Sequence, residues 1–508
     1  MPQDIDEAFL ALPLRPLADA ALQRARDLGA EHAAFRLERI RSQHLTLRDA
    51  RLEGSSDGEV VGLSVRVLHQ GTWGFAAGVE LTAEAAARVA EEAVALAGIA
   101  RPLARTRVEL ADEPVHADVT WVSEYAVNPF EVPDADKVAL LADYSARVLG
   151  QDAVEHVSAR LSQVLECTFY ADTAGTVTTQ QRVRLEPELE AVAVDAEAGT
   201  FETMRTLAAP VARGWEYVTG EDGTVGWAAS LDELGPLLAE RLAAPSFEAG
   251  RYDLVIDPTN LWLTIHESVG HATELDRALG YEANYAGTSF ATLDRLGTLE
   301  YGSGVMHVTG DRTTPHGLAS VGYDHEGVAA QSWDIVRDGV LVGYQLDRAM
   351  AHANADALGV TRSNGCAFAD SPGHVPVQRM ANVSLQPAPD GPDTAGLIER
   401  VEDGLYIVGD KSWSIDMQRY NFQFTGQRAY RIRHGRLEGQ VKDFAYQATT
   451  TDFWGSMEAV GGPATYVLGG TFFCGKAEPG QAAPVSHGAP SALFRGISVL
   501  NTAEEGGR

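Results

Sequence analysis

The sequence is short of cysteine and of positive charge. Its three cysteines, Cys167, Cys366 and Cys474, are widely spaced and odd in number, which argues against a disulfide framework and fits a reducing compartment. Because 71 acidic residues face only 40 lysines and arginines, the net charge of −31 argues against a nucleic acid partner. A cysteine with a special role is therefore expected to be a metal ligand or a nucleophile rather than half of a crosslink.

Signals for membranes and secretion are also missing. No stretch approaches the length of a membrane span, and the first residues, MPQDIDEAFL, lack the basic and apolar segments of a secretory leader. An apolar fraction of 45% with 22% charged residues is typical of a globular chain, and 508 residues are too many for one ordinary core. We therefore expect a cytoplasmic protein of more than one domain, with no membrane partner.

Helix and strand patterns alternate in the first half of the chain. Strict alternation of apolar residues predicts strands within residues 35–47 and 61–67, and turn signals predict a strand meander over 152–227. Apolar residues at helical spacing predict three helices, over residues 14–28, 82–98 and 133–150. This mixture is typical of an α+β unit.

The second half is expected to be β-rich. A turn-prone, unperiodic segment, APSFEAG at residues 244–250, marks the boundary. It is followed by one helix, predicted over residues 261–279, and then by strand patterns with hairpin turns at Asp338-Gly339 and His434-Gly435. The sequence thus predicts an α+β protein with an N-terminal α/β-layer domain, residues 1–246, and a β-rich, sandwich- or barrel-like C-terminal domain, residues 247–508, that carries this helix.

The predicted helix contains the motif HExxxH, from His266 to His271. A hydrolytic zinc site needs two neutral imidazoles facing one point, an open position for water and a carboxylate, here Glu267, to take the proton of that water. In the usual HExxH motif the histidines are four residues apart and share a helix face, whereas a spacing of five turns the second away by roughly 140°. A π-bulge near Gly270 would restore the alignment, so we predict irregular helical bonding between Ser268 and His271.

The motif alone leaves an alternative open, because two histidines on an amphipathic helix can be purely structural. A third ligand would decide between the two interpretations. The candidates, near and distant in sequence, are Glu274, Asp276, Glu282, His307, His325 and Cys474.

Four elements in the second half resemble those of the TldD/PmbA family, and they occur in the same order. They are the HExxxH motif with its following acidic turn, YDHEG at residues 323–327, PVQRMAN at 376–382, and CGK at 474–476 followed by PVSHG at 484–488. The resemblance covers essentially the whole chain and is most specific over residues 251–490.

The resemblance implies a zinc metallopeptidase that acts on short or unfolded peptides. The ligands it implies are His266, His271 and Cys474, with Glu267 activating the water; a thiolate is a strong zinc ligand. It also implies that this chain is the catalytic, TldD-like subunit that pairs with a TldE/PmbA-like subunit, although a homodimer is an alternative.

Three further residues of these elements are candidates for contact with substrate. Arg379 and Asn382 would either position the substrate backbone or brace their own strand. His325 stands where relatives often have an acid, and we expect an exposed turn residue there or a residue that contacts substrate. Two other functions remain open: a non-catalytic peptide-binding or scaffolding subunit, and a zinc amidohydrolase that tailors a peptide natural product.

Overall fold

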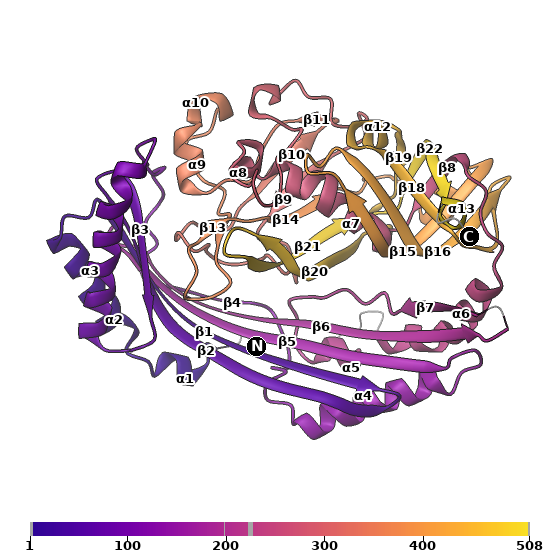
Figure 1. Cartoon of the computed structure of the whole chain (residues 1–508), viewed down its shortest axis with the longest axis horizontal. Helices are drawn as coiled ribbons and strands as arrows, with labels where there is room; N and C mark the ends of the chain where they lie inside the picture. The colour runs from indigo at the N-terminus through magenta and orange to yellow at the C-terminus, as the bar shows by residue number, and fades with distance from the viewer. Residues whose placement is uncertain (1–3, 198, 222–226, 506–508) are drawn as a thin grey trace.

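One long, curved sheet forms the floor of the molecule (Figure 1). The structure is a computed structural model that describes residues 4–197, 199–221 and 227–505. All strand pairs in the sheet are antiparallel except that of β4 with β6. The order of neighbouring strands is β3 (Thr72–Gly78), β2 (Arg51–His69), β1 (His32–Arg48), β5 (His156–Asp172), β6 (Val177–Asp195) and β4 (Val119–Val122), with β7 (Thr200–Arg205) also paired to β6.

Helices cover the apolar face of this sheet. Phe35, Leu37, Leu45 and Leu47 alternate along β1, so all four point to one face. The first two join one hydrophobic core and the last two join another at the far end of the sheet. The covering helices are α1 (Glu7–Leu10), α2 (Leu14–Asp27), α3 (Ala83–Ala100), α4 (Asp134–Leu149), α5 (Glu216–Thr219) and α6 (Leu234–Ala243). The three helices predicted for this half are confirmed to within two residues.

The opposite face of the sheet is polar and packs against the second half of the chain. Arg36 and Glu38, which alternate with the apolar residues of β1, are 4% and 0% exposed. Arg36 Nη1 donates to His325 Nδ1 at 2.9 Å, and Gln180 Nε2 donates to the carbonyl of Tyr323 at 2.9 Å. The contact between the two halves is therefore built from hydrogen bonds and ion pairs as well as from apolar packing.

The second half contains a closed five-stranded barrel. The strands of the ring are β15 (Asp403–Ile415), β8 (Gly250–Ile256), β22 (Ala492–Asn501), β18 (Phe444–Thr449) and β16 (Asn421–Arg433), and pairing of β15 with β16 closes it. The strands β17 (Arg436–Val441) and β19 (Met457–Val460) extend it. The predicted α+β class and the β-rich second half are confirmed, while the division at residues 246 and 247 stays a prediction.

Smaller elements complete this half. Asp338 and Gly339, and likewise His434 and Gly435, have positive φ, as a type I′ turn requires, which confirms both hairpins. The small sheets consist of β9 (Val308–Asp311), β10 (Ser332–Arg337), β11 (Val340–Leu341) and β14 (Asn382–Leu385); of β12 (Ala367–Phe368) and β13 (Val377–Gln378); and of β20 (Val467–Lys476) and β21 (Gln481–Ala489). The helices are α7 (Pro258–Ile265), α8 (Leu275–Ala278), α9 (Arg348–Ala353), α10 (Ala355–Leu358), α11 (Thr394–Ile398), α12 (Thr450–Gly455) and α13 (Thr502–Glu505).

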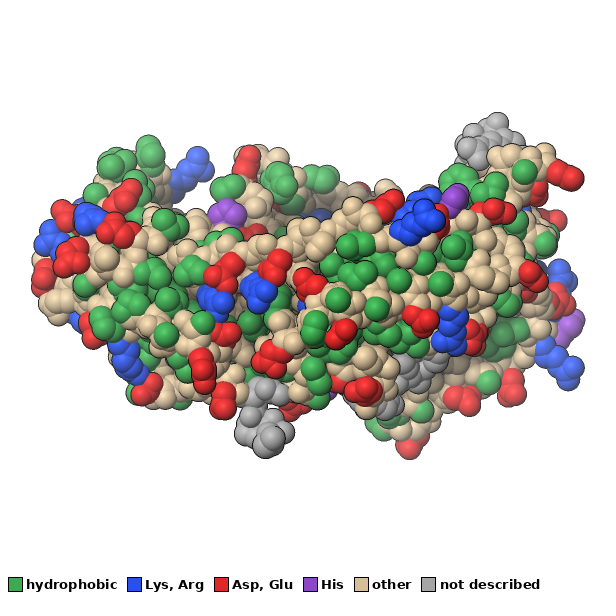
Figure 2. Space-filling model, turned by 90° about the horizontal axis from the view of Figure 1, so that it is seen from below, with side chains coloured by type: hydrophobic (Ala, Val, Ile, Leu, Met, Phe, Trp, Pro, Cys, Tyr) green, Lys and Arg blue, Asp and Glu red, His purple; other side chains and the backbone are tan. Residues whose placement is uncertain are grey.

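The surface reflects the composition. Seen from below, acidic side chains are spread over the whole face among basic and apolar ones rather than gathered in one patch (Figure 2). Within the described residues, no helix has both the length and the apolar character needed to cross a membrane.

Candidate metal centre

The HExxxH motif, His266 to His271, directly follows helix α7. The helix begins at Asp257, whose side chain accepts a hydrogen bond from the backbone N–H of Thr259, and Pro258 occupies the first turn, where no N–H is needed. The helix is α-helical to Ile265 and then continues as a π-turn from His266 to Gly270.

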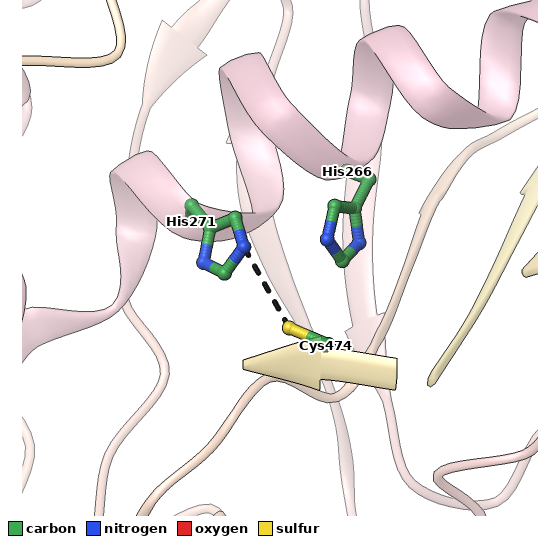
Figure 3. Close-up of side chains that lie close together, drawn as sticks. All are labelled: His266, His271 and Cys474. Atoms are coloured by element: carbon green, nitrogen blue, oxygen red, sulfur yellow. Dashed lines mark hydrogen bonds between the residues drawn. The ribbon is translucent and has the colours of Figure 1, made fainter. Parts of the chain in front are cut away.

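The π-turn confirms the irregularity predicted from the histidine spacing. The N–H of His271 donates to the carbonyl of His266, five residues back, and the two imidazole centroids lie 4.7 Å apart. Glycine at position 270 leaves room for the side chain of Met380, because a Cβ there would lie 2.5 Å from Met380 Sδ unless that side chain moved. Both histidines thus point to the same side of the helix (Figure 3).

The prediction of one continuous helix over residues 261–279 is wrong. A short 3₁₀ turn follows the π-turn, and Glu274 then adopts an extended backbone before α8 begins at Leu275. Gln345, which is distant in sequence, stabilises the break. Its side-chain Nε2 donates to the backbone carbonyl of Gly270 at 2.7 Å, and the backbone N–H of Gln345 donates to the carbonyl of Thr273 at 3.0 Å. These bonds satisfy carbonyls that the interrupted helix leaves free.

Cys474, on β20, completes a group of three donors. Its Sγ lies 3.6 Å from His271 Nε2, and one donor atom from each of Cys474, His266 and His271 lies within 4.8 Å of the others. Burial alone would raise the pKa of Cys474, but the neighbouring His271 and Arg379 lower it. Figure 3 shows the sulfur directed from its strand toward both rings.

The other two cysteines have a different environment. Burial raises the pKa of Cys167 and of Cys366 to about 12. Both remain thiols at neutral pH and fill space as small apolar side chains. Of the three cysteines, Cys474 is thus the one suited to ligate a cation as a thiolate.

Hydrogen bonds set the protonated nitrogen of His266. His487 Nδ1 lies 2.7 Å from the carbonyl of Val383, which only accepts, so this nitrogen carries the proton of the ring. Burial and the nearby His266 lower the pKa of His487 well below its usual value, so its Nε2 is an acceptor. That atom lies 2.7 Å from His266 Nδ1, which must donate. The lone pair on His266 Nε2 is therefore free for a cation.

His271 is oriented by a carboxylate. Its Nδ1 lies 2.9 Å from Glu274 Oε2 and donates to it, which leaves Nε2, 3.6 Å from Cys474 Sγ, as the nitrogen that can face a cation. Glu274 is itself held by Lys476 Nζ at 3.1 Å and by Arg277 Nε at 3.3 Å, and Lys476 also donates to Asp276 at 2.7 Å. Burial would raise the pKa of Glu274, but Lys476, His271 and Arg277 lower it well below its usual value. The carboxylate is therefore ionised.

These donors fit a zinc ion. Two imidazoles with free Nε2 atoms and one thiolate form a nitrogen and sulfur set that zinc favours, with room for a further ligand. All three residues line a cavity of about 440 Å³ between the two halves of the chain. Its other lining residues are Glu186, Pro187, Glu188, Arg205, Thr206, Ala208, Pro210, Trp262, Leu263, Glu267, Asp410, Lys411, Trp413, Arg419, Gly470, Thr471, Phe473 and Gly475.

Glu267 lines the same cavity and is 6% exposed. Arg419 Nη1 donates to its Oε2 at 2.5 Å. Burial would raise the pKa of Glu267, but His266, His271 and Arg419 lower it below its usual value. The carboxylate is therefore ionised and able to accept a proton.

The three predicted substrate contacts lie elsewhere. Arg379 is 1% exposed and donates to the backbone carbonyls of Cys474 and Gln481, while Asn382 is 0% exposed and donates to the carbonyl of Asp311. The expectation of an exposed His325 is wrong: it is 7% exposed, because the polar face of β1 covers it. These three are absent from the described cavity lining, and their contact with substrate stays a prediction.

The remaining candidate ligands have other partners. Glu282 accepts the backbone N–H of Ala477 at 3.3 Å, and His307 lies beside Asp338 at 3.4 Å on the surface. The sequence did not reveal three residues that hold the motif in place. Glu274, which orients His271, was considered only as a candidate ligand, and His487, which orients His266, only as part of the PVSHG element. Arg419, which bonds to Glu267, carried no sequence signal.

Comparison with known proteins places this geometry in a family. Models of the PmbA/TldA metallopeptidase family match residues 249–501 as its C-terminal domain and residues 33–97 as its domain 1. A protein of Methanothermobacter thermautotrophicus named "Metalloprotease" is 28% identical over 476 residues, 93% of this chain and 96% of that protein.

Two other similarities extend over nearly the whole chain. The "Zinc metalloprotease TldD homolog" of Saccharolobus solfataricus is 22% identical over 483 residues, 94% of this chain and 98% of that protein. The crystal structure of TldE from Thermococcus kodakarensis superposes with a TM-score of 0.68 at 13% identity, covering 95% of this chain and 99% of that one, which shows a shared fold. The family models, these relatives and the shared fold agree: the chain belongs to the TldD/PmbA family.

Proposed function

We propose that this chain is a zinc-dependent metallopeptidase that hydrolyses peptide bonds in short or unfolded peptides. The observation that carries the proposal is the convergence of His266, His271 and Cys474 beside the ionised Glu267 in one cavity. The name of the Saccharolobus relative supports the choice of zinc, and the names of several relatives support peptide hydrolysis.

The residues of the site have separate tasks in this mechanism. His266, His271 and Cys474 would hold the zinc ion, which supplies a Lewis acid that makes water a nucleophile near neutral pH and polarises the peptide carbonyl. Glu267 accepts the proton of the attacking water and delivers it to the leaving amine. Glu274 and His487 keep the protons of the two ligand rings on Nδ1, so that each Nε2 remains available.

The shape of the cavity supports an extended substrate. Its walls come from β6 and β7 on one side and from α7, β15 and β20 on the other. A site enclosed by both halves admits a chain segment more readily than a folded domain. We therefore propose short or unfolded peptides as the substrate class.

We further propose that this chain is the catalytic subunit of a TldD/TldE-type pair in the cytoplasm. The chain has the HExxxH motif that the catalytic subunit needs, and its fold is shared with TldE. Its three cysteines are all free, which suits a reducing compartment.

Purified protein tests the proposal, alone and mixed with a TldE/PmbA-like subunit. We expect about one zinc per chain by mass spectrometry, and hydrolysis of casein that a chelator abolishes and added zinc restores. Protein without stoichiometric metal and without activity would favour the scaffolding function. Stoichiometric zinc without casein hydrolysis, under either condition, would favour an amidohydrolase with a non-peptide substrate.

A further inference from the structure

Arg419 lies at the tip of the hairpin between β15 and β16, and the backbone there is firmly held. Its φ of 61° is in the left-handed region. The carboxylate of Asp416 accepts the N–H groups of Tyr420 at 2.8 Å and Asn421 at 3.0 Å, and Thr450 Oγ1 donates to the carbonyl of Arg419 at 2.7 Å. The turn therefore presents the Arg419 side chain from a fixed position.

The side chain of Arg419 reaches across the cavity to the motif. Its Nη1 donates to Glu267 Oε2 at 2.5 Å, and the side chains of Arg419 and Glu267 are 15% and 9% exposed. The two other cations of the cavity lining have different partners, since Arg205 pairs with Asp410 and Lys411 with Glu202. The ion pair of Arg419 is thus made with the residue to which we assign proton transfer.

Such a pair restricts the carboxylate. A short, charge-assisted hydrogen bond at Oε2 fixes the rotamer and the plane of the carboxyl group. A base that must meet a water in one geometry gains rate from this restriction, because misplacement by about 1 Å costs as much as about 100-fold. Burial of the Glu267 carboxylate favours its neutral form. The positive charge of Arg419 opposes this effect and favours the ionised form.

We propose that Arg419 is a positioning residue for Glu267, and this inference rests on the proposed hydrolysis. It engages Oε2 and so leaves Oε1 to accept the proton of the attacking water. The sequence between Ile415 and Asn421 is thus part of the active site, although it carries no motif.

Replacement of the guanidinium tests the proposal. We expect Arg419→Ala to lower kcat by about 10- to 100-fold with KM within about two-fold of wild type. Metal content should stay at the wild-type level, because the side chain of Arg419 bonds to Glu267, which is not a proposed ligand. Arg419→Lys should retain an intermediate kcat, since an ammonium keeps the charge without the planar fork. Arg433→Ala is the matched control. Arg433 is exposed at the other end of β16 and pairs with Glu438, so its replacement should change neither kcat nor KM.

Chemical rescue separates positioning from a merely structural role. Free guanidinium is small enough to enter the cavity vacated by Arg419→Ala, and we expect it to raise kcat while urea at the same concentration does not. Unchanged kcat in Arg419→Ala, loss of its metal, or equal effects of guanidinium and urea would each overturn the proposal.

A structural measurement distinguishes this proposal from the proposed function itself. A wild-type protein that hydrolyses no peptide would contradict the function. The crystal structure of Arg419→Ala would still decide the role of Arg419: a rotated Glu267 carboxylate supports it, and an unmoved one refutes it.

Discussion

Among the residues that the structure describes, two buried clusters each place three possible metal ligands within 4.8 Å of one another. The first is His266, His271 and Cys474, which we call the thiolate cluster. The second is Glu38, Glu166 and His325, which we call the carboxylate cluster and which lies between the long sheet and the second half. The two clusters differ in whether the lone pairs of their ligand atoms are available to a cation.

In the carboxylate cluster, His325 and Glu166 are held by hydrogen bonds from neighbouring groups, and Glu38 Oε2 lies 3.1 Å from Arg36 Nε. His325 Nδ1 accepts hydrogen bonds from Arg36 at 2.9 Å and from the N–H of Ala369 at 3.1 Å, so its proton is on Nε2, which faces Glu38. Both carboxylate oxygens of Glu166 accept hydrogen bonds from Arg182 or Arg184. A cation there would meet an N–H and several arginines.

The thiolate cluster has the opposite arrangement. Each of its rings gives its Nδ1 proton to a neighbour, His487 for His266 and Glu274 for His271, and so keeps a free lone pair on Nε2. The comparison teaches that proximity of ligand-type residues is a weak criterion for a metal site. The positions of the protons, set by residues outside the cluster, decide whether the site can bind a cation.

The largest expected difference between the clusters concerns catalysis. Glu267→Gln should lower kcat by about 1,000-fold, because the amide cannot accept the proton of the water. Zinc content should be unchanged, since Glu267 is not a proposed ligand. The matched variant Glu38→Gln, also a buried glutamate beside an arginine, should leave kcat within about two-fold of wild type. Steady-state kinetics and metal analysis measure both; a fully active Glu267→Gln would remove its assigned role.

The next largest effect concerns zinc affinity. Cys474→Ser should weaken zinc binding by about 100-fold or more, because a neutral hydroxyl replaces a thiolate. Cys366→Ser, at a buried cysteine outside both clusters, should leave affinity unchanged. Competition with a chromophoric chelator gives the two dissociation constants. Tight, stoichiometric zinc in Cys474→Ser would mean that another residue is the third ligand.

Much of this centre could be predicted from sequence, and the reasons for the omissions are physical. The five-residue spacing of the histidines was sufficient to predict the π-turn, because helix geometry is local. Cys474 lies 203 residues from His271, and the family resemblance was needed to single it out. Glu274 could not be recognised as a helix break, since the bonds that stabilise it come from Gln345.

The errors share a cause. His325 was expected to be exposed because a glycine-containing turn is usually on the surface, but Arg36, 289 residues away, covers it. Arg419 was overlooked because its partner Glu267 is 152 residues distant and its hairpin has no distinctive composition. Sequence patterns report which face of an element is apolar, whereas the partner of a buried polar group depends on how the two halves pack.

The third prediction concerns stability and belongs to the carboxylate cluster. Burial, reinforced by Glu166, raises the pKa of Glu38 to about 7 although Arg36 opposes the shift. Between about pH 4.5 and 7 the folded protein then holds a proton on Glu38 that the unfolded chain releases. The free energy of unfolding contributed by Glu38 is therefore fully present below about pH 4.5 and is lost as pH rises through about 7. The loss amounts to about 3 kcal/mol.

Glu38→Gln should abolish that pH dependence. The difference in unfolding free energy between wild type and variant should shift in favour of the variant as pH rises across this window, since glutamine has no charge to bury. Urea denaturation at several pH values measures it. A difference that stays constant with pH would show that folding does not raise the pKa of Glu38.

The smallest effect on zinc binding is expected for Glu274, the carboxylate that orients His271 in the thiolate cluster. Glu274→Gln should weaken zinc binding only about 10-fold, because the amide oxygen can still accept the Nδ1 proton of His271 but without the negative charge. Lys476 keeps two of its partners, Asp276 and the carbonyl of Gln378, so the fold should survive. The same chelator competition measures the change. An unaltered affinity would mean that the proton of His271 is placed by something other than Glu274, and the distinction drawn between the two clusters would then rest on His266 and His487 alone.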